Sequence, residues 1–175
     1  MVRNAYFFYL WKSKPVLTPL ITMEQTLVII KPGTIQRGYI GEIIQRFEKK
    51  GLQLCGMKMI QLDEKILLEH YAHLADRPFF KRIKDAMMIT PVIVCCWKGK
   101  DAIRIVRAMA GVTNGRDAAP GTIRGDYSVS VQENIIHASD APETAAIELK
   151  RFFNEDEIFD YKQHQLDFLY ANDEI

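Results

Sequence analysis

Hydrophobic residues along this chain follow two spacings, one typical of strands and the other of helices. Continuous apolar runs at residues 26–30 and 91–97 predict buried strands, and a further strand is expected from 52 to about 62. Apolar positions at i, i+3, i+4 and i+7 predict helices between and after these strands. The positions that define the helices are Ile40, Ile43, Ile44 and Phe47, then Leu67, His70, Tyr71 and Leu74, then Ala102, Ile105, Val106 and Met109.

Glycines and acidic residues mark where these helices begin and end. Gly51 ends the first helix, Asp63 is expected to cap the second, and Asp101 is expected to begin the third. A turn at 76–80 leads into a short helical stretch, and a loop containing glycine and proline extends over 111–125. The long elements are therefore bounded by local start or stop signals.

His137 lies between two further predicted elements. Alternating apolar positions at 127–131 predict a strand before it, and Asp140, Pro142 and Glu143 after it have the order of an N-cap, a first-turn proline and a capping-box acid. The imidazole is therefore predicted on a loop held between a strand and a helix, where functional residues are enriched. A single loop histidine more often has no catalytic role, so its surroundings must decide.

The expected partner of this histidine is Glu148, two turns into the last helix. The buried stripe of that helix is predicted to consist of Ala145, Leu149, Phe152 and Phe153. Glu148 falls at the edge of this stripe, where a carboxylate would orient the imidazole and make it a better nucleophile. The other interpretation, a glutamate that extends to solvent, fits the pattern equally well.

The order of the main elements predicts the fold. With the inserted helices set aside it is strand, helix, strand, strand, helix, strand, which is typical of an α+β protein with the ferredoxin-like split βαββαβ topology. We expect one four-stranded antiparallel sheet covered by helices. The 175 residues, of which 48% are hydrophobic and 26% charged, suit one globular domain with a sizeable core.

Net charge and cysteine content narrow the class of protein. A formal net charge of +1 provides no overall positive field for a nucleic-acid backbone, so we expect no nucleic acid to be required and any anion site to come from locally converging lysines and arginines. Small phosphorylated ligands remain open. The cysteines Cys55, Cys95 and Cys96 lack the spacing of a zinc site or of a disulfide framework. We expect them to be buried, reduced thiols of a cytoplasmic protein.

The first 22 residues differ in composition from the rest. An aromatic run at 6–11 is followed by lysines and prolines, without the small-residue cleavage site of a signal peptide. The run is also much shorter than the roughly 20 apolar residues that cross a membrane. We expect residues 1–22 to be an extension outside the fold, ahead of a single domain at 23–175, and we expect no membrane association.

Basic residues in the predicted loops and at the edges of elements are candidates for a phosphate site. They are Lys31, Arg77, Arg107 and Arg124. A guanidinium presents paired planar donors that match phosphate oxygens, but each of these residues alone is more often a solvated surface charge. No P-loop motif and no Gly-x-Gly-x-x-Gly fingerprint occurs, so a nucleotide site would have to be built from converging side chains.

Six segments of the chain closely resemble nucleoside diphosphate kinases, in the same order and with family-like spacing. They are Lys31-Pro32 with Gln36-Arg37-Gly38, His70-Tyr71, Arg77-Pro78-Phe79-Phe80, Gly111-Val112-Thr113-Asn114, Gly121-Thr122-Ile123-Arg124-Gly125-Asp126, and Asn134-Ile135-Ile136-His137-Ala138-Ser139-Asp140. The resemblance extends from about residue 24 to 170 and is most specific around His137. It implies a ferredoxin-like subunit that passes the terminal phosphoryl group of a nucleoside triphosphate such as ATP, through a phosphohistidine, to a diphosphate such as ADP or GDP.

The resemblance also implies a role for each matching residue. His137 is implied to be the phosphorylated nucleophile, oriented by Glu148 and Ser139, with Tyr71 nearby. Phe79 is implied to stack on the base, opposite Val131. The residues implied to contact the ribose and the phosphates are Lys31, Asn134, Arg107, Thr113 and Arg124, with Arg77 beside them. Mg²⁺ is implied to be held by the nucleotide phosphates, without a direct protein ligand, in a ping-pong reaction.

Four residues, at three places in the chain, depart from the family pattern. Gly33-Thr34 stands where members usually have Asp-Gly, Gly115 where many have proline, and Ala138 where glycine is common. None of these changes removes the nucleophile or a donor, but Gly115 lies in a loop that members use for subunit contacts. A closed homo-oligomer is implied, and the tail at 161–170 favours a hexamer over a tetramer.

Two other functions are compatible with the same residues. A nucleotide-binding or interaction module would keep the fold and lose the reaction, and a phosphohistidine relay would pass the group to a protein partner. The intact His137, Lys31 and Glu148 argue against the first alternative. No docking surface is visible for the second.

Overall fold

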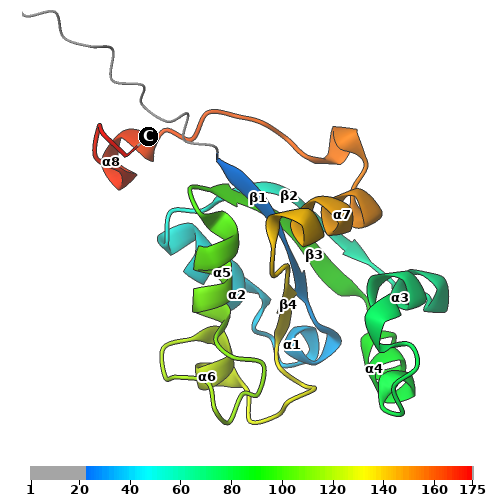
Figure 1. The fold of residues 1–175 in the computed structure, drawn as a ribbon. Coiled ribbons are helices and arrows are strands. Elements are labelled where there is room, and N and C mark those ends of the chain that lie inside the picture. The colour runs from blue at the N-terminus through cyan, green and yellow to red at the C-terminus, as the bar shows by residue number, and fades with distance from the viewer. Residues whose placement is uncertain (1–22, 175) are drawn as a thin grey trace, which may run out of the picture.

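The computed structural model describes residues 23–174, so the expected extension at 1–22 lies outside the described residues. The strands are β1 (Glu24–Ile30), β2 (Gln53–Ile60), β3 (Val92–Gly99) and β4 (Ile136–Ala138). The α-helices are α1 (Pro32–Gln36), α2 (Ile40–Lys49), α3 (Glu64–His70), α4 (Phe80–Met87), α5 (Ala102–Ala110), α6 (Ile123–Tyr127), α7 (Pro142–Phe152) and α8 (Leu166–Leu169) (Figure 1). Short 3₁₀ helices follow α3 and α7, as η1 (Ala72–Leu74) and η2 (Glu155–Glu157).

The four strands form one antiparallel sheet in the order β2-β3-β1-β4. β1 pairs with β3 along its whole length, from Glu24 opposite Gly99 to Ile30 opposite Ile93, and with β4 over three residues. A strand in the centre of a covered sheet is buried on both faces, which explains the continuous apolar run in β1. This is the ferredoxin-like sheet that the element order predicted.

Helices cover both faces of the sheet, and the alternation of side chains along β1 divides the core between them. Val28 and Ile30 pack on the face covered by α2 and α5. Leu27 and Ile29 pack on the opposite face, with residues of α3, α4 and α7. The elements that approach β4 from this second face supply part of the functional site.

The strand predicted at 127–131 is wrong. The chain forms α6 up to Tyr127, continues as an irregular segment, and enters the fourth strand only at Ile136. The apolar residues that suggested alternation are exposed, Val129 by 82% and Val131 by 51%. The Ser128 hydroxyl instead donates to the backbone of this segment, and such local bonds compete with strand pairing. His137 therefore lies on a strand, not on a loop.

The predicted helix starts are confirmed in part. Asp63 caps α3, because its carboxylate accepts the backbone N–H of Ile66 at 2.8 Å. Asp101 precedes α5 but makes no capping hydrogen bond. α7 begins at Pro142 as predicted, whereas its N-cap is Ala141 and not Asp140.

The three cysteines are buried and form no disulfide, as predicted. Burial raises the pKa of the Cys95 thiol to about 12, so this thiol stays protonated.

Within residues 23–174, no helix has both the length and the apolar character that crossing a membrane requires.

Candidate active site

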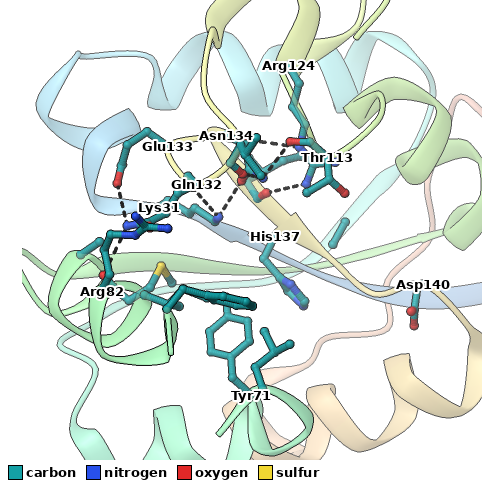
Figure 2. Close-up of a pocket in the computed structure, with 18 of the residues that line it drawn as sticks. Lys31, Tyr71, Arg82, Thr113, Arg124, Gln132, Glu133, Asn134, His137 and Asp140 are labelled. Carbon is teal, nitrogen blue, oxygen red and sulfur yellow. Dashed lines mark hydrogen bonds between the residues drawn. The ribbon is translucent and has the colours of Figure 1, made fainter. Parts of the chain in front are cut away.

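A cavity of about 530 Å³ lies where the ends of β1 and β4 meet α7, the α3–α4 segment and the loop after α5 (Figure 2). Most of the residues selected from the sequence line it, namely Lys31, Tyr71, Phe79, Arg107, Thr113, Arg124, Val131, Asn134, His137 and Glu148. Ser139 lies behind Glu148. Arg77 is exposed in its turn and does not line the cavity. The fold therefore brings together basic and polar side chains that are far apart in the sequence.

His137 is held by the sheet and by a carboxylate. Its backbone pairs with Ile29 on β1, and its ring extends into the cavity with 21% of the side chain exposed (Figure 2). The ring atom Nε2 lies 2.9 Å from Oε1 of Glu148. Because an ionised carboxylate can only accept, Nε2 carries the proton. In the neutral ring, Nδ1 then keeps its lone pair.

Glu148 is buried and paired, so the interpretation in which it extends to solvent is wrong. Its second oxygen, Oε2, accepts the Ser139 hydroxyl at 2.5 Å. Burial alone would raise the pKa of Glu148, but the hydrogen bonds from His137 and Ser139 outweigh burial and hold the pKa below its usual value. The site therefore contains a fixed negative charge behind the imidazole.

His70 brings a third ligand-type side chain to this pair. Nitrogen and oxygen atoms of His70, His137 and Glu148 lie within 4.8 Å of one another, a spacing that also suits a metal ion. However, the 2.9 Å between His137 and Glu148 is that of a hydrogen bond, and Arg151 brings a positive charge within 3.4 Å of His70 Nδ1. The three side chains therefore form a polar network and not a preformed metal centre.

Lys31, Asn134 and Thr113 form a second polar group in the cavity. The Lys31 ammonium donates to Asn134 Oδ1 at 2.6 Å and to the backbone oxygen of Gln132 at 3.2 Å. The Asn134 amide in turn donates to the backbone oxygen of Thr113 at 3.0 Å. Burial, with a contribution from Arg124, lowers the pKa of Lys31 to about 8. An ammonium has three protons, so one remains for a ligand.

Arg124 is buried and largely tied to the protein itself. Its Nε, Nη1 and Nη2 atoms donate to the backbone oxygens of Asn134, Gly111 and Ile136 at 3.2, 2.7 and 2.9 Å. Burial and the neighbouring Arg107 lower the pKa of Arg124 to about 10. A guanidinium has five N–H donors, so one proton on each terminal nitrogen is left over. Arg124 therefore connects the segments around the cavity and still has one donor on each terminal nitrogen for a ligand.

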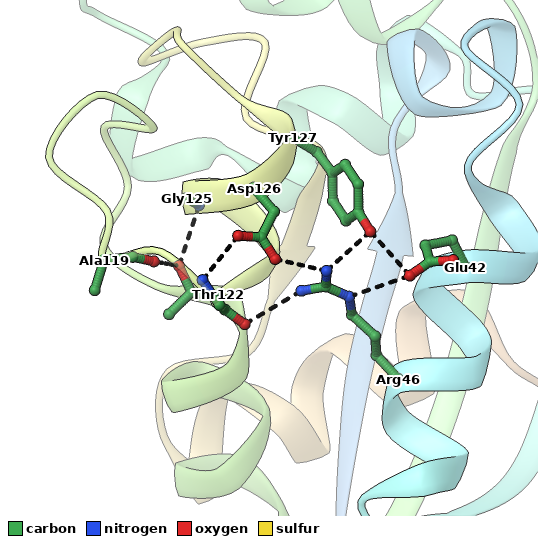
Figure 3. Close-up of polar contacts among 8 residues, drawn as sticks. Glu42, Arg46, Ala119, Thr122, Gly125, Asp126 and Tyr127 are labelled. Atoms are coloured by element: carbon green, nitrogen blue, oxygen red, sulfur yellow. Dashed lines mark hydrogen bonds and ion pairs between the residues drawn. The ribbon is translucent and has the colours of Figure 1, made fainter.

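Arg46 of α2 anchors α6, the helix that carries Arg124 (Figure 3). Its Nη2 atom donates to Asp126 at 2.6 Å and to the Tyr127 hydroxyl at 2.9 Å. The Tyr127 hydroxyl donates onward to Glu42 of α2 at 2.9 Å. Two residues of α2, Arg46 and Glu42, therefore hold two residues of α6, and the position of Arg124 on α6 depends on α2.

The departures from the family pattern fit their surroundings. The N–H of Gly115 donates to the backbone oxygen of Ser130 at 3.0 Å, a bond that proline could not make. A side chain at this position would place its Cβ 2.4 Å from the backbone oxygen of Ser128. Thr34 donates through its hydroxyl to the backbone oxygen of Ile135 at 2.6 Å, and Ala138 is buried in the core.

The cavity also contains residues that no sequence motif singled out. Arg82 lies one turn beyond Phe79, and Gln132 and Glu133 lie between Val131 and Asn134 (Figure 2). The i, i+3 spacing from Phe79 could have identified Arg82, because it places both side chains on one face of a helix. The other two lie on the segment that was wrongly predicted to follow a strand.

Comparisons with known proteins agree over most of the chain. The profile of the nucleoside diphosphate kinase family matches residues 24–158. A nucleoside diphosphate kinase of Parabacteroides distasonis is 72% identical over 153 residues, which cover 87% of this chain and 100% of that protein. Another, from Pyrococcus horikoshii, is 51% identical over 141 residues, which cover 79% of this chain and 90% of that protein. A solved nucleoside diphosphate kinase of Halobacterium salinarum, in complex with CDP, matches with a TM-score of 0.83 and 41% identity over 86% of this chain and 100% of that chain. The chain therefore belongs to the nucleoside diphosphate kinase family of nucleotide-dependent phosphotransferases.

Proposed function

We propose that this enzyme transfers the γ-phosphoryl group of a nucleoside triphosphate, such as ATP, to a nucleoside diphosphate through a phosphohistidine on His137. The observation that carries the proposal is the 2.9 Å bond from His137 Nε2 to Glu148 Oε1. This bond leaves the lone pair on Nδ1, the ring nitrogen that would become phosphorylated.

The reaction has two half-reactions at one site. In the first, the Nδ1 lone pair of His137 forms a bond to the γ-phosphorus while the bond to the β–γ bridging oxygen breaks, and the diphosphate leaves with that electron pair. In the second, a terminal oxygen of another diphosphate attacks the phosphorus and the pair returns to Nδ1. Glu148 stabilises the positive charge that develops on the ring in the first step. Ping-pong kinetics follow.

Side chains of the cavity supply the nucleotide contacts in this proposal. Phe79 and Val131 are 41% and 51% exposed, so an apolar pair is open to a base, and stacking accepts any base because every base has a π-face. Broad use of nucleotides, and a role in maintaining the pools of CTP, GTP and UTP, follow from such contacts. The residues proposed to hold the ribose and the phosphates are Lys31, Asn134, Arg107, Thr113 and Arg124.

Mg²⁺ fits this site as an ion carried by the nucleotide. Among the carboxylates of residues 23–174 that line the cavity, Glu148 uses both oxygens for His137 and Ser139, which leaves the exposed Asp140 and Glu133. Mg²⁺ in proteins often keeps several waters and binds through substrate phosphates, so phosphate oxygens would hold it without a protein cage. When bound there, it neutralises charge on the β- and γ-phosphates.

The assembly and the location of the enzyme are part of the proposal. We propose a cytoplasmic homo-oligomer, a hexamer in preference to a tetramer, of subunits whose catalytic domain occupies 23–175. The tail at 161–170 supports this, because Tyr161 donates to the backbone of β2 at Leu54 and gives the tail a fixed position on the fold. Sedimentation of the purified chain measures the subunit number directly.

Labelled ATP tests the reaction. The protein is incubated with γ-labelled ATP and Mg²⁺, tested for acid-labile, alkali-stable label, and then chased with GDP. We expect label on the wild type and on His164→Asn, an exposed histidine outside the cavity, but none on His137→Asn. Absence of label on the wild type would favour a nucleotide-binding module, and label that GDP does not remove would favour a relay to a protein partner.

A further inference from the structure

A second imidazole, which the proposed reaction does not use, lies directly behind the catalytic pair. His70 ends α3, and its side chain is 1% exposed. The rings of Tyr71, His137 and Phe152 stand nearly perpendicular to it, with centroids at 4.6, 4.5 and 5.2 Å. An apolar side chain would fill this space without burying polar atoms that need partners. The histidine therefore requires an explanation other than packing.

The explanation lies in the two neighbours of His70 Nδ1. This atom is 3.4 Å from Nη1 of Arg151 and 3.6 Å from Oε1 of Glu148, the oxygen that also bonds His137. Arginine can only donate, so in the hydrogen bond with Arg151 Nδ1 is the acceptor and the ring proton lies on Nε2, which has no hydrogen-bond partner within residues 23–174. Burial, with the nearby His137, lowers the pKa of His70 to about 3, so the ring stays neutral near pH 7.

A neutral ring in this orientation leaves Glu148 to the nucleophile. Nδ1 of His70 carries no proton, because its one lone pair accepts from Arg151, so His70 does not compete with His137 Nε2 for Oε1 of Glu148. It also holds Arg151, whose Nε lies 3.3 Å from Glu69 of α3. A charged ring at this position would divide the carboxylate between two imidazoles and place a second positive charge beside the one that forms on His137.

We propose that His70 is a positioning residue, whose Nδ1, held by Arg151, keeps Glu148 directed at His137 Nε2 and thereby keeps the lone pair of His137 on Nδ1. The inference rests on the proposed phosphohistidine reaction. It concerns the orientation and tautomer of the nucleophile, and it assigns no nucleotide contact to His70.

Two substitutions separate the polar role from packing. Asparagine places an oxygen near the position of Nδ1 and can accept from Arg151, whereas phenylalanine fills the space without an acceptor. We expect His70→Asn to form phosphohistidine within about threefold of the wild-type rate, and His70→Phe to be slower by about tenfold with an unchanged KM for nucleotide. Wild-type rates in His70→Phe, or a slower His70→Asn than His70→Phe, would overturn the proposal.

The tautomer of His137 provides a readout that packing alone would not change. Nitrogen NMR of labelled protein should place the proton of His137 on Nε2 in the wild type and in His70→Asn, and partly on Nδ1 in His70→Phe. The same tautomer in all three proteins would contradict the assigned role. His164→Asn serves as the matched control, since this histidine is exposed in the tail.

Arg151→Met tests the same link from its other end, because methionine has a similar length but no donor, and it does not alter His70. If the two side chains act together, Arg151→Met should slow phosphohistidine formation, and adding it to His70→Phe should slow the reaction no further. Additive losses, or no loss in Arg151→Met, would sink the proposal even if His70→Phe folds poorly. Label on the wild type tests the proposed function, whereas ratios of variant to wild type and the NMR tautomer test His70, so the two can fail separately.

Discussion

Ile29 on β1 and His137 on β4 lie directly opposite each other in the sheet. Opposite residues of antiparallel strands project to the same face, so His137 points to the side where Ile29 packs with α3 and α7. Glu148 comes from α7 and His70 from α3, and both therefore reach the ring. The nucleophile is thus held by the central strand of the sheet, and its orientation does not depend on a flexible segment.

Replacing Glu148 by glutamine should affect the chemical step and leave binding intact. The amide keeps the size of the side chain but lacks the negative charge that stabilises the imidazolium-like ring, so we expect kcat to fall by about 100-fold or more. The Kd for ADP should change by less than about twofold, because Glu148 acts on His137 and not on the nucleotide. Rapid-quench kinetics and titration calorimetry measure the two quantities. Glu143→Gln, exposed in the first turn of α7, is the control, and a large loss of ADP binding in the Glu148 variant would refute this role.

Lys31 should make nucleotide binding sensitive to alkaline pH. Its lowered pKa of about 8 means that the ammonium is charged below that pH and neutral above it. We expect the affinity for ADP to weaken by about tenfold between pH 7 and 9, as one positive donor is lost. Calorimetry across this range measures the change. Lys31→Arg should flatten the profile, because arginine keeps its charge, and a pH-dependence that survives in this variant would assign the effect to another group.

The same group should influence stability with the opposite sign. The folded-state pKa of Lys31 lies below the ordinary lysine value of 10.5 expected for the unfolded chain, so between about pH 8 and 10.5 the unfolded chain binds more protons. The contribution of Lys31 to the free energy of unfolding should therefore rise with pH through this window. Urea unfolding of the wild type and of Lys31→Met at pH 8 and 10 isolates it, and a larger rise in the variant than in the wild type would contradict the sign.

Arg124→Lys should destabilise the fold although it preserves the charge. A lysine cannot reach three separated carbonyl oxygens at once, so at least two of the bonds to Asn134, Gly111 and Ile136 are lost. Leaving these buried acceptors unpaired should lower the free energy of unfolding by about 3 kcal/mol. Arg116→Lys, at an exposed position of the loop that precedes α6, should be neutral within about 0.5 kcal/mol. Equal stability of the two variants would show that the three contacts contribute little.

Two glycine substitutions should have opposite effects. Alanine at 115 would place a methyl group 2.4 Å from the Ser128 carbonyl oxygen, and we expect a loss of about 2 kcal/mol in the free energy of unfolding. Alanine at Gly41 in α2 meets nothing within 4 Å and should stabilise the helix by about 0.5 kcal/mol. Thermal unfolding of both variants under one condition tests the contrast, which fails if Gly115→Ala is as stable as Gly41→Ala.

The fold could be predicted from local patterns because its main elements carry strong signals. The apolar run of β1 reflects burial on both faces, and the cap at Asp63 acts within one turn of its helix. The segment at 127–131 misled because its apolar alternation is not used for burial, and hydroxyl-to-backbone bonds from Ser128 determine its shape. Such bonds depend on how the segment folds back on itself, which spacing alone does not reveal.

Patterns in the sequence identified the residues of the candidate site one by one, but not their grouping in space. Convergence of Lys31, Arg124 and His137 depends on the sheet order, and the resemblance to a known family made the grouping predictable before the geometry was known. The resemblance also implied that Glu148 orients His137, whereas the pattern of α7 alone left a paired and a solvent-exposed glutamate equally open. Arg82 was missed although its i, i+3 spacing from Phe79 was informative, because its place in the cavity depends on how α4 lies against the sheet.

The burial of Cys55, Cys95 and Cys96 makes the folded chain unreactive toward maleimides and similar electrophiles, because only an ionised and accessible sulfur attacks them. A molecule must open its interior before it can be tagged. The rate at which the cysteines become labelled therefore measures how often the folded chain opens. The measurement needs no engineered probe, so it can be made in crude extracts or inside cells, where no spectroscopic transition can be followed.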